Sequence, residues 1–323
     1  MVSRRHVLKG AAGAALAGTI VRGGIAGIAA QDKQPVKVGS KNFTEQLILG
    51  EMYAQLLEAA GIPVQRRLNL GGTAVAQAAL VKGDIDLYPE YTGTGLEVVL
   101  AIPIDSIKNA TPVAEAGASA TPMSASIDER VYQTVKADYK KRFDLVWLDQ
   151  APFNDTQALA VKKDFAAKNN LVTISDLAKI AGNLTIVAPS DFVERPDGLK
   201  GLEDTYSMKF GNVLSVEPGI RYQALENDQA QVVLAFGTDG QVSGMNLALL
   251  KDDKGLWPPY HVAPVVRQQT LDAYPNLADT LNKVAPLLTD QVMSGLNWKV
   301  DGPDKAEPAD VAKAFLQENK LVS

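Results

Sequence analysis

Residues 36–89 read VKVGSKNFTEQLILGEMYAQLLEAAGIPVQRRLNLGGTAVAQAALVKGDIDLYP. Short apolar runs alternate here with longer stretches of helical periodicity, in the order strand, helix, strand, helix, strand. Thr44 is a suitable N-cap for the first helix, and Gly61 and Pro63 end it. The predicted elements are strands at 36–39, 64–70 and 85–88 and helices at 45–60 and 73–82. This order is typical of the first half of a doubly wound α/β sheet.

The rest of the chain repeats the alternation. A second set of units begins near residue 158 and includes strands near 184–188, 213–216 and 232–236. Three helical stretches, at about 269–273, 276–294 and 308–319, follow near the C-terminus. Residues 102–126, rich in Ala, Ser, Thr and Pro, interrupt the pattern and predict a surface insertion with little regular structure. The sequence therefore predicts two α/β lobes of about 100 residues each, with a ligand cleft between them and a C-terminal helical part that returns to the first lobe.

Composition excludes several classes of protein. The 323 residues contain 32 Lys and Arg against 37 Asp and Glu, a formal net charge of −5, which lacks the basic character of a nucleic-acid-binding protein. There is no cysteine, so disulfides, thiolate metal sites, cysteine nucleophiles and a lipid anchor on Cys are excluded. Only two histidines occur, which excludes a multi-histidine metal site.

The first 30 residues have the character of an export signal. Residues 3–9 read SRRHVLK, residues 10–21 are uncharged and rich in Ala and Gly, and small residues follow at 27–30. The adjacent Arg4 and Arg5 are similar to a twin-arginine signal, which is read by a receptor. An ordinary cytosolic N-terminal helix is the alternative, but the many glycines disfavour it. We expect residues 1–30 to be a signal peptide and the mature protein to be periplasmic or otherwise extracytoplasmic.

Polar and aromatic residues gather where predicted strands end. The segments are 39–46 (GSKNFTEQ), 86–95 (DLYPEYTGTG), 153–157 (FNDTQ), 236–240 (FGTDG) and 257–260 (WPPY), together with Arg195. Each aromatic taken alone is more typical of the core than of a binding site. Together, aromatic faces that hold a cation and Lys, Arg and helix N–H groups that hold an anion are suited to a zwitterion.

These segments also carry a resemblance to a known family. Residues 39–46, 88–94 (YPEYTGT), 154–156 (NDT), 219–225 (GIRYQAL) and 238–240 (TDG) look like the glycine betaine/choline/carnitine-binding proteins of osmoprotectant ABC transporters. The resemblance implies a bilobal type II periplasmic-binding-protein fold. Its lobes would be residues 34–147 plus 241–323 and residues 148–240, joined at a hinge. It also implies closure of the lobes on a quaternary-ammonium ligand and delivery to an ABC permease.

The resemblance implies particular site residues. The ligand carboxylate would meet Lys41, Thr94 and Arg195. The cage around the ammonium would consist of Tyr91, Gln157, Phe236 and Tyr260, with Asp155 as the acidic residue facing it. Gln157 stands where the family usually has Tyr, and Phe236 where Tyr is common, so three aromatic walls are expected here.

Other functions remain alternatives at this point. A binding protein of the same fold for a different small zwitterion, such as an amino acid, is one of them. An enzyme on this fold is disfavoured because His261 is the only histidine after the signal, and no phosphate-binding or dinucleotide motif occurs. We expect a monomeric binding protein without a metal or another cofactor.

Overall fold

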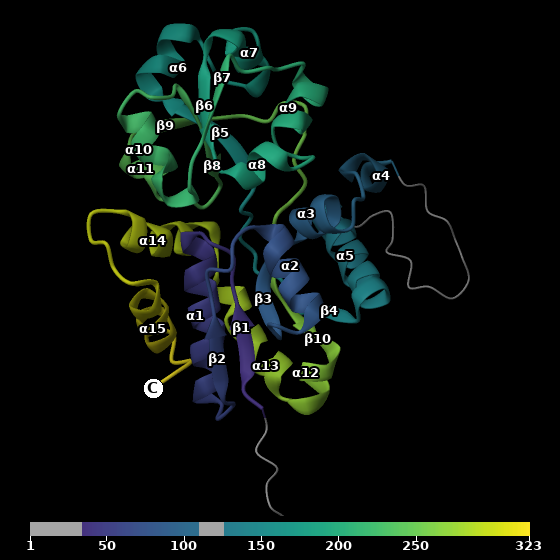
Figure 1. Ribbon diagram of the computed structural model, residues 1–323. Helices are drawn as coiled ribbons and strands as arrows, with labels where there is room; N and C mark the ends of the chain where they lie inside the picture. Colours follow the sequence, from purple (N-terminus) through teal and green to yellow (C-terminus); the bar gives the residue numbers. More distant parts are fainter. Residues whose placement is uncertain (1–33, 110–125) are drawn as a thin grey trace, which may run out of the picture. The chain divides into compact units, whose positions relative to one another are not determined.

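The computed structural model describes residues 34–109 and 126–323. The expected signal peptide and most of the expected insertion at 102–126 lie outside these residues. Among the residues described, no helix has the length and apolar character needed to cross a membrane. Two five-stranded sheets, each covered by helices, form the framework of this part of the chain (Figure 1).

The first lobe is built around the sheet with strand order β2-β1-β3-β10-β4. Strands β1, β2 and β3 are parallel, whereas β10 runs antiparallel to both β3 and β4. The strands are β1 (Val36–Gly39), β2 (Val64–Arg67), β3 (Leu87–Tyr91), β4 (Leu145–Trp147) and β10 (Val262–Arg267). Strand β3 continues past Pro89, where the sequence predicts its end, and Pro89 lies opposite Pro264 of β10. Strand β10 thus joins this sheet from a part of the chain more than one hundred residues after β4.

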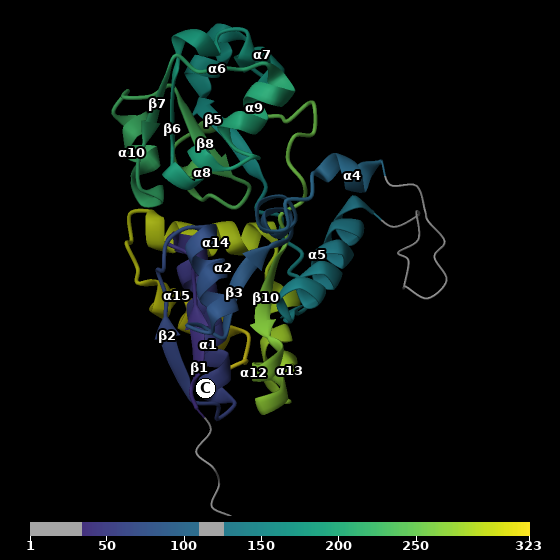
Figure 2. The same cartoon turned by 45° about the vertical axis from the view of Figure 1, so that its right-hand side comes forward.

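Helix α1 (Thr44–Ala59) occupies the centre of the first lobe. Its residues are buried on most sides because the sheet packs on one side and α13, α14 and α15 pack on the other (Figures 1 and 2). Phe43 takes the N-cap position without a side-chain cap, and Thr44 is the first helical residue, whose hydroxyl donates instead to Asp301 at 2.6 Å. The expected Thr44 cap is therefore wrong.

The other helices of the first lobe follow the predicted order with one break. The expected helix at 276–294 is divided by Pro286, which cannot continue an α-helix. The helices are α2 (Thr73–Lys82), α3 (Thr92–Thr94), α4 (Ile104–Lys108), α5 (Ile127–Phe143), α12 (Gln268–Ala273), α13 (Leu277–Asn282), α14 (Asp290–Asp301) and α15 (Pro308–Glu318). A π-helical turn, η1 (Gly95–Val99), follows α3, and a 3-10 turn, η4 (Ala285–Leu287), precedes α14.

The second lobe is built around the sheet with strand order β7-β6-β8-β5-β9. Its strands are β5 (Gln157–Lys162), β6 (Thr185–Ala188), β7 (Asn212–Ser215), β8 (Val232–Phe236) and β9 (Leu247–Leu250). Its helices are α6 (Lys163–Asn169), α7 (Ile174–Ala178), α8 (Ser190–Glu194), α9 (Leu199–Tyr206), α10 (Arg221–Glu226) and α11 (Gln241–Gly244), with 3-10 turns η2 (Ala181–Asn183) and η3 (Pro218–Ile220). Strand β8 is buried along almost its whole length, as its apolar sequence predicts.

Two segments connect the sheets, one between β4 and β5 and the other between β9 and β10. They pair with each other through an isolated bridge between Asn154 and His261, and the Asn154 side chain accepts the Tyr260 N–H at 2.8 Å. The sequence places the end of the second lobe at residue 240. Because β9 pairs antiparallel with β5, the second sheet extends to Leu250, and the chain returns to the first sheet later than expected.

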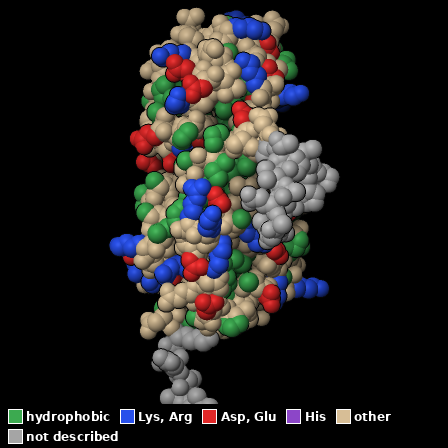
Figure 3. Space-filling view, turned by 90° about the vertical axis from the view of Figure 1, so that its right-hand side faces the viewer, with side chains coloured by type: hydrophobic (Ala, Val, Ile, Leu, Met, Phe, Trp, Pro, Cys, Tyr) green, Lys and Arg blue, Asp and Glu red, His purple; other side chains and the backbone are tan. Residues whose placement is uncertain are grey.

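The surface carries both signs of charge. Lys and Arg side chains are interspersed with Asp and Glu side chains over the face shown in Figure 3. This mixture agrees with the small net charge of −5.

Candidate functional site

A cavity with about 620 Å³ of space, part of it open to solvent, is lined by residues from both lobes and both connecting segments. All eight residues that the sequence predicts for the site line this one cavity. The other lining residues are Asn42, Phe43, Gly72, Thr73, Pro189, Asp191, Phe192, Pro218 and Leu234. The cavity therefore brings together segments that are up to about two hundred residues apart in the chain.

Strand ends position most of these side chains. Lys41 lies between β1 and α1, Tyr91 ends β3, and Phe236 ends β8. Because ligands bind outside the carboxyl ends of strands in α/β sheets, this is the expected place for a site. Asp155 and Tyr260 come instead from the two connecting segments, where the Asp155 N–H donates to Tyr260 O at 3.1 Å.

Aromatic rings form one part of the cavity lining. Phe43 lies between Tyr91 and Phe236, with ring centroids 6.2 and 6.3 Å away and ring planes inclined by 24° and 15°. Tyr260 packs on Gly93, where an added Cβ would lie 2.7 Å from the Tyr260 ring. This close approach explains the glycine of the Tyr-Thr-Gly-Thr turn. Sequence reasoning missed Phe43, although the residue stands in the first polar segment that it singled out.

Two buried carboxyl groups lie beside these rings and share one hydroxyl. Thr238 Oγ1 lies 2.6 Å from Glu45 Oε2 and 2.7 Å from Asp155 Oδ1. Tyr91 and Asn297 also donate to Glu45, at 2.8 and 3.0 Å. A hydroxyl has one proton and can donate to only one of the two groups, so the other contact requires a proton on a carboxyl group.

Burial supplies the energetic reason for that proton. Desolvation raises the pKa of Glu45 to about 7, although hydrogen bonds from Thr238, Asn297 and Tyr91 act in the opposite direction. Desolvation, and then the nearby Glu45 charge, raise the pKa of Asp155 well above its ordinary range. A cation in the cavity would favour the charged forms of both groups.

Lys41 supplies positive charge beside the aromatic rings, since its Nζ lies 5.2 Å from the centroid of the Tyr91 ring. Its ammonium lies 2.6 Å from Glu90 Oε1 and 3.1 Å from Thr73 Oγ1, and both members of the ion pair are almost completely buried. An ammonium group has three N–H donors. Within the described residues these two contacts use two of them, which leaves one for a ligand.

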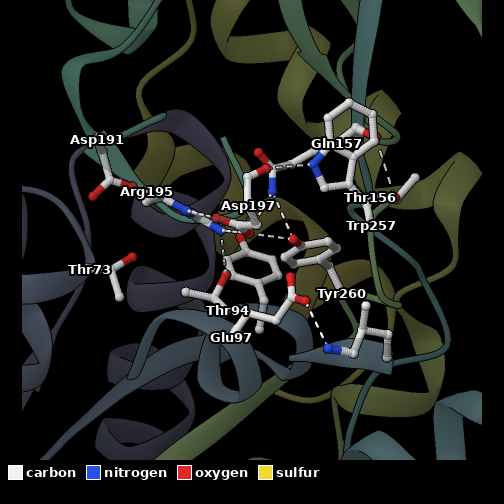
Figure 4. Close-up of polar contacts among 12 residues, drawn as sticks. Thr73, Thr94, Glu97, Thr156, Gln157, Asp191, Arg195, Asp197, Trp257 and Tyr260 are labelled. Carbon is white, nitrogen blue, oxygen red and sulfur yellow. Dashed lines mark hydrogen bonds and ion pairs between the residues drawn. The ribbon is translucent and has the colours of Figure 1, made fainter. Parts of the chain in front are cut away.

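Arg195 supplies the second positive charge, and it too is paired. Its Nε and Nη2 lie 2.8 and 2.5 Å from the two carboxylate oxygens of Asp197, which is a bidentate ion pair (Figure 4). Its Nη2 lies 3.5 Å from Thr94 Oγ1, and its Nη1 lies 3.4 Å from Asp191 Oδ2. Arg195 and Thr94 therefore meet across the cavity, as expected for two residues that contact one anion. Asp197 was not predicted.

Gln157 has a polar environment that explains why it is not aromatic. Its amide nitrogen donates to Asp197 at 2.9 Å and to the Tyr260 hydroxyl at 2.7 Å. The Tyr260 hydroxyl in turn donates to Asp197 at 2.6 Å. The side chain lines the cavity, but its amide belongs to a network that fixes Tyr260 and Asp197.

The described residues contain no group of three or more His, Cys, Asp or Glu side chains placed to hold a metal ion. The imidazole of His261 contacts main-chain oxygens of the connecting segment instead, with Nδ1 2.8 Å from Phe153 O.

Comparisons with known proteins agree with the geometry. The family model described as the substrate binding domain of ABC-type glycine betaine transport systems matches residues 34–318. The chain belongs to this family. The resemblance read from the sequence motifs is thereby confirmed.

Individual relatives of this binding domain span several ligands. The ergothioneine transport permease/ergothioneine binding protein EgtU of Helicobacter pylori is 35% identical over 287 residues, which are 88% of this chain and 48% of EgtU. The chain thus spans about half the length of that relative. The glycine betaine-binding protein YehZ of Escherichia coli is 34% identical over 310 residues, which are 92% of this chain and 96% of YehZ. By their names, both relatives serve in binding or transport.

Solved structures confirm the α/β fold class. The crystal structure of a glycine betaine/carnitine/choline ABC transporter protein has a TM-score of 0.66 and 30% identity, and the match covers 88% of this chain and 99% of that one. The binding domain has the bilobal fold of periplasmic binding proteins, which the sequence predicted.

Proposed function

We propose that this protein captures a quaternary-ammonium solute of the glycine betaine class by lobe closure and delivers it to an ABC permease. The observation that carries the proposal is the single cavity that contains all eight sequence-predicted residues. The lining of the cavity combines aromatic rings and the carboxyl group of Asp155 with two cations, Lys41 and Arg195. A zwitterion with a trimethylammonium group and a carboxylate has the complementary charges.

In this proposal the ammonium group lies among Tyr91, Phe236 and Tyr260, with Asp155 offsetting its charge. Each desolvated contact between a cation and an aromatic face contributes about 2 kcal/mol. The carboxylate lies at the other end, where it accepts hydrogen bonds from Lys41, Thr94 and Arg195. No cofactor or catalytic group takes part, so the ligand leaves the protein chemically unchanged.

The proposed delivery role requires a location outside the cytoplasm. We propose that residues 1–30 direct export through the twin-arginine route and that the monomeric mature protein works outside the cytoplasm without a lipid anchor on Cys, since the sequence contains no cysteine. A membrane permease is the expected partner. Cell fractionation of the full chain checks this location, and recovery of the mature protein in the cytoplasm would contradict it.

A different small zwitterion is the second candidate for the ligand. The observation that favours it is the polar network of Gln157, Asp197 and Tyr260, which replaces an aromatic wall with hydrogen-bonding groups. A zwitterion with additional polar atoms and no quaternary ammonium, such as an amino acid, would use these groups.

A thermal-shift panel distinguishes the two candidates. The panel contains glycine betaine, choline, carnitine, proline betaine, ergothioneine, ectoine and amino acids, each at concentrations up to the millimolar range. Because a ligand that binds only the native state stabilises it by about 2.7 kcal/mol at 100 times its Kd, binders raise the melting temperature measurably. We expect quaternary-ammonium compounds to raise it. A shift caused by amino acids alone would contradict the proposal and support the second candidate.

A further inference from the structure

Asp197 lies at the centre of a hydrogen-bond network that sequence reasoning did not identify. Asp197 is only 3% exposed to solvent. Oδ1 accepts from Arg195 Nε at 2.8 Å, and Oδ2 accepts from Arg195 Nη2, the Tyr260 hydroxyl and the Gln157 amide at 2.5, 2.6 and 2.9 Å. Figure 4 shows Asp197 among these three side chains. One carboxylate therefore contacts residues from three separate parts of the chain.

The main chain around Asp197 is also held in place. The Gly198 N–H donates to Arg195 O at 3.1 Å and closes a tight turn, in which a Cβ at position 198 would lie 1.8 Å from Phe192 O. Only glycine is accommodated there. On the other side, the Trp257 indole N–H donates to Asp197 O at 2.8 Å. Hydrogen bonds on both sides therefore fix the backbone that carries the Asp197 carboxylate.

This arrangement orients the Arg195 guanidinium. Asp197 holds the edge formed by Nε and Nη2, so Nη1 and the remaining N–H of Nη2 are directed toward Asp191 and Thr94. Asp191, Thr94 and Arg195 line the cavity, whereas Asp197 is not among its lining residues. Asp197 therefore acts on a ligand through Arg195, Tyr260 and Gln157, which it contacts and which line the cavity.

The charge balance makes this orientation important. Burial tends to raise the pKa of Asp197, but the Arg195 charge and hydrogen bonds from Arg195, Tyr260 and Gln157 outweigh it and lower the pKa. Asp197 is consequently ionised at neutral pH, and the Arg195–Asp197 pair has no net charge. A carboxylate that binds Arg195 then gains from directed N–H groups more than from net charge, and such hydrogen bonds depend on geometry.

We infer that Asp197 is a positioning residue that selects ligands bearing a carboxylate, because it presents one edge of Arg195 to the cavity. The inference rests on the proposed function, since it assumes a quaternary-ammonium ligand. A carboxylate-bearing ligand such as glycine betaine depends on this edge. Choline, which has the same trimethylammonium group and no carboxylate, does not.

The test measures dissociation constants for glycine betaine and choline by calorimetry in the wild type and in Asp197→Asn, which keeps the size of the side chain and removes its charge. Glycine betaine binding is expected to weaken at least about tenfold, and choline binding by no more than about twofold. Asp204→Asn, an exposed aspartate on the following helix that pairs with Lys200, is the matched control and should change neither value.

A double-mutant cycle shows whether Asp197 acts through Arg195. In an Arg195→Ala background, Asp197→Asn should cause no further loss of glycine betaine affinity. Equal losses for both ligands, or a full additional loss in the double variant, would overturn the inference. Tighter glycine betaine binding by Asp197→Asn would also overturn it, because Asp197 would then compete with the ligand for Arg195.

A second variant covers the case in which Asp197→Asn does not fold. Arg195→Lys retains the charge but loses the bidentate contact that fixes the guanidinium. It should weaken glycine betaine binding at least about tenfold and affect choline far less. Unchanged glycine betaine affinity in this variant contradicts the inference. A wild-type chain that binds neither ligand instead removes the proposed function, and with it the inference.

Discussion

Arg195→Ala is expected to weaken glycine betaine binding by about 2–5 kcal/mol, which is roughly 30-fold to several thousand-fold in Kd. The variant removes the guanidinium that would contact the ligand carboxylate. It also leaves Asp197 buried without its ion-pair partner. The carboxylate of the ligand and the carboxylate of Asp197 therefore both lose the Arg195 guanidinium. Isothermal titration calorimetry on the purified variant measures the loss directly.

Two controls separate binding from folding in this experiment. Arg67→Ala, at the exposed end of β2, removes an arginine that does not line the cavity and should leave the affinity unchanged. Thermal unfolding without ligand reports whether Arg195→Ala is folded at the temperature of the titration. A folded Arg195→Ala variant that binds glycine betaine as tightly as the wild type would exclude Arg195 from the site.

The second large effect concerns pH. The free energy of unfolding of the ligand-free protein should fall as the pH rises from about 4.5 to about 7. Desolvation raises the pKa of Glu45 from 4.5 to about 7, and the pKa of Asp155 is raised as well. Across this window the folded state holds protons that the unfolded state has lost, so rising pH favours unfolding. For Glu45 alone the change is about 3 kcal/mol.

Denaturant titrations between pH 4.5 and pH 8.5 measure this dependence. Glu45→Gln removes one titrating group and should make the free energy of unfolding fall less steeply with pH. The control Glu58→Gln removes an exposed carboxylate that pairs with Arg66, and it should leave the fall in this free energy unchanged. Stability that rises between pH 4.5 and pH 7 in the wild type, or an identical decline in Glu45→Gln, would show that Glu45 does not hold the proton.

Local patterns were sufficient for most of the fold. The alternation of strands and helices in residues 36–89 predicted β1, α1, β2, α2 and β3 nearly in place, because hydrophobic periodicity is a local property. Strand β9 was missed because Leu247–Leu250 is a short apolar run without alternation, which periodicity does not distinguish from helix or loop. Pairing with β5, about ninety residues earlier, makes it a strand.

The same limit applies to the site. The motifs and the family resemblance placed eight residues that line one cavity. Most of them stand near strand ends or in connecting segments, whereas Arg195 directly follows α8. From the sequence, Gln157 was recognised only as the residue that replaces an aromatic wall of the cage. Its amide has a structural partner in Asp197, forty residues away, and sequence spacing alone does not show that contact. Phe43 did not emerge from the sequence because a single aromatic residue in a polar segment is more typical of core packing than of a ligand contact.

The most direct test of the cation site compares glycine betaine with 3,3-dimethylbutanoate, which has the same shape and carboxylate but a carbon atom in place of the quaternary nitrogen. The rings of Tyr91, Phe236 and Tyr260 and the buried Asp155 should hold the ammonium group through its charge. In side-by-side calorimetric titrations of the wild type, glycine betaine should bind at least about 100-fold more tightly than its uncharged-head analogue. Equal affinities for the two compounds would contradict a quaternary-ammonium site in this cavity.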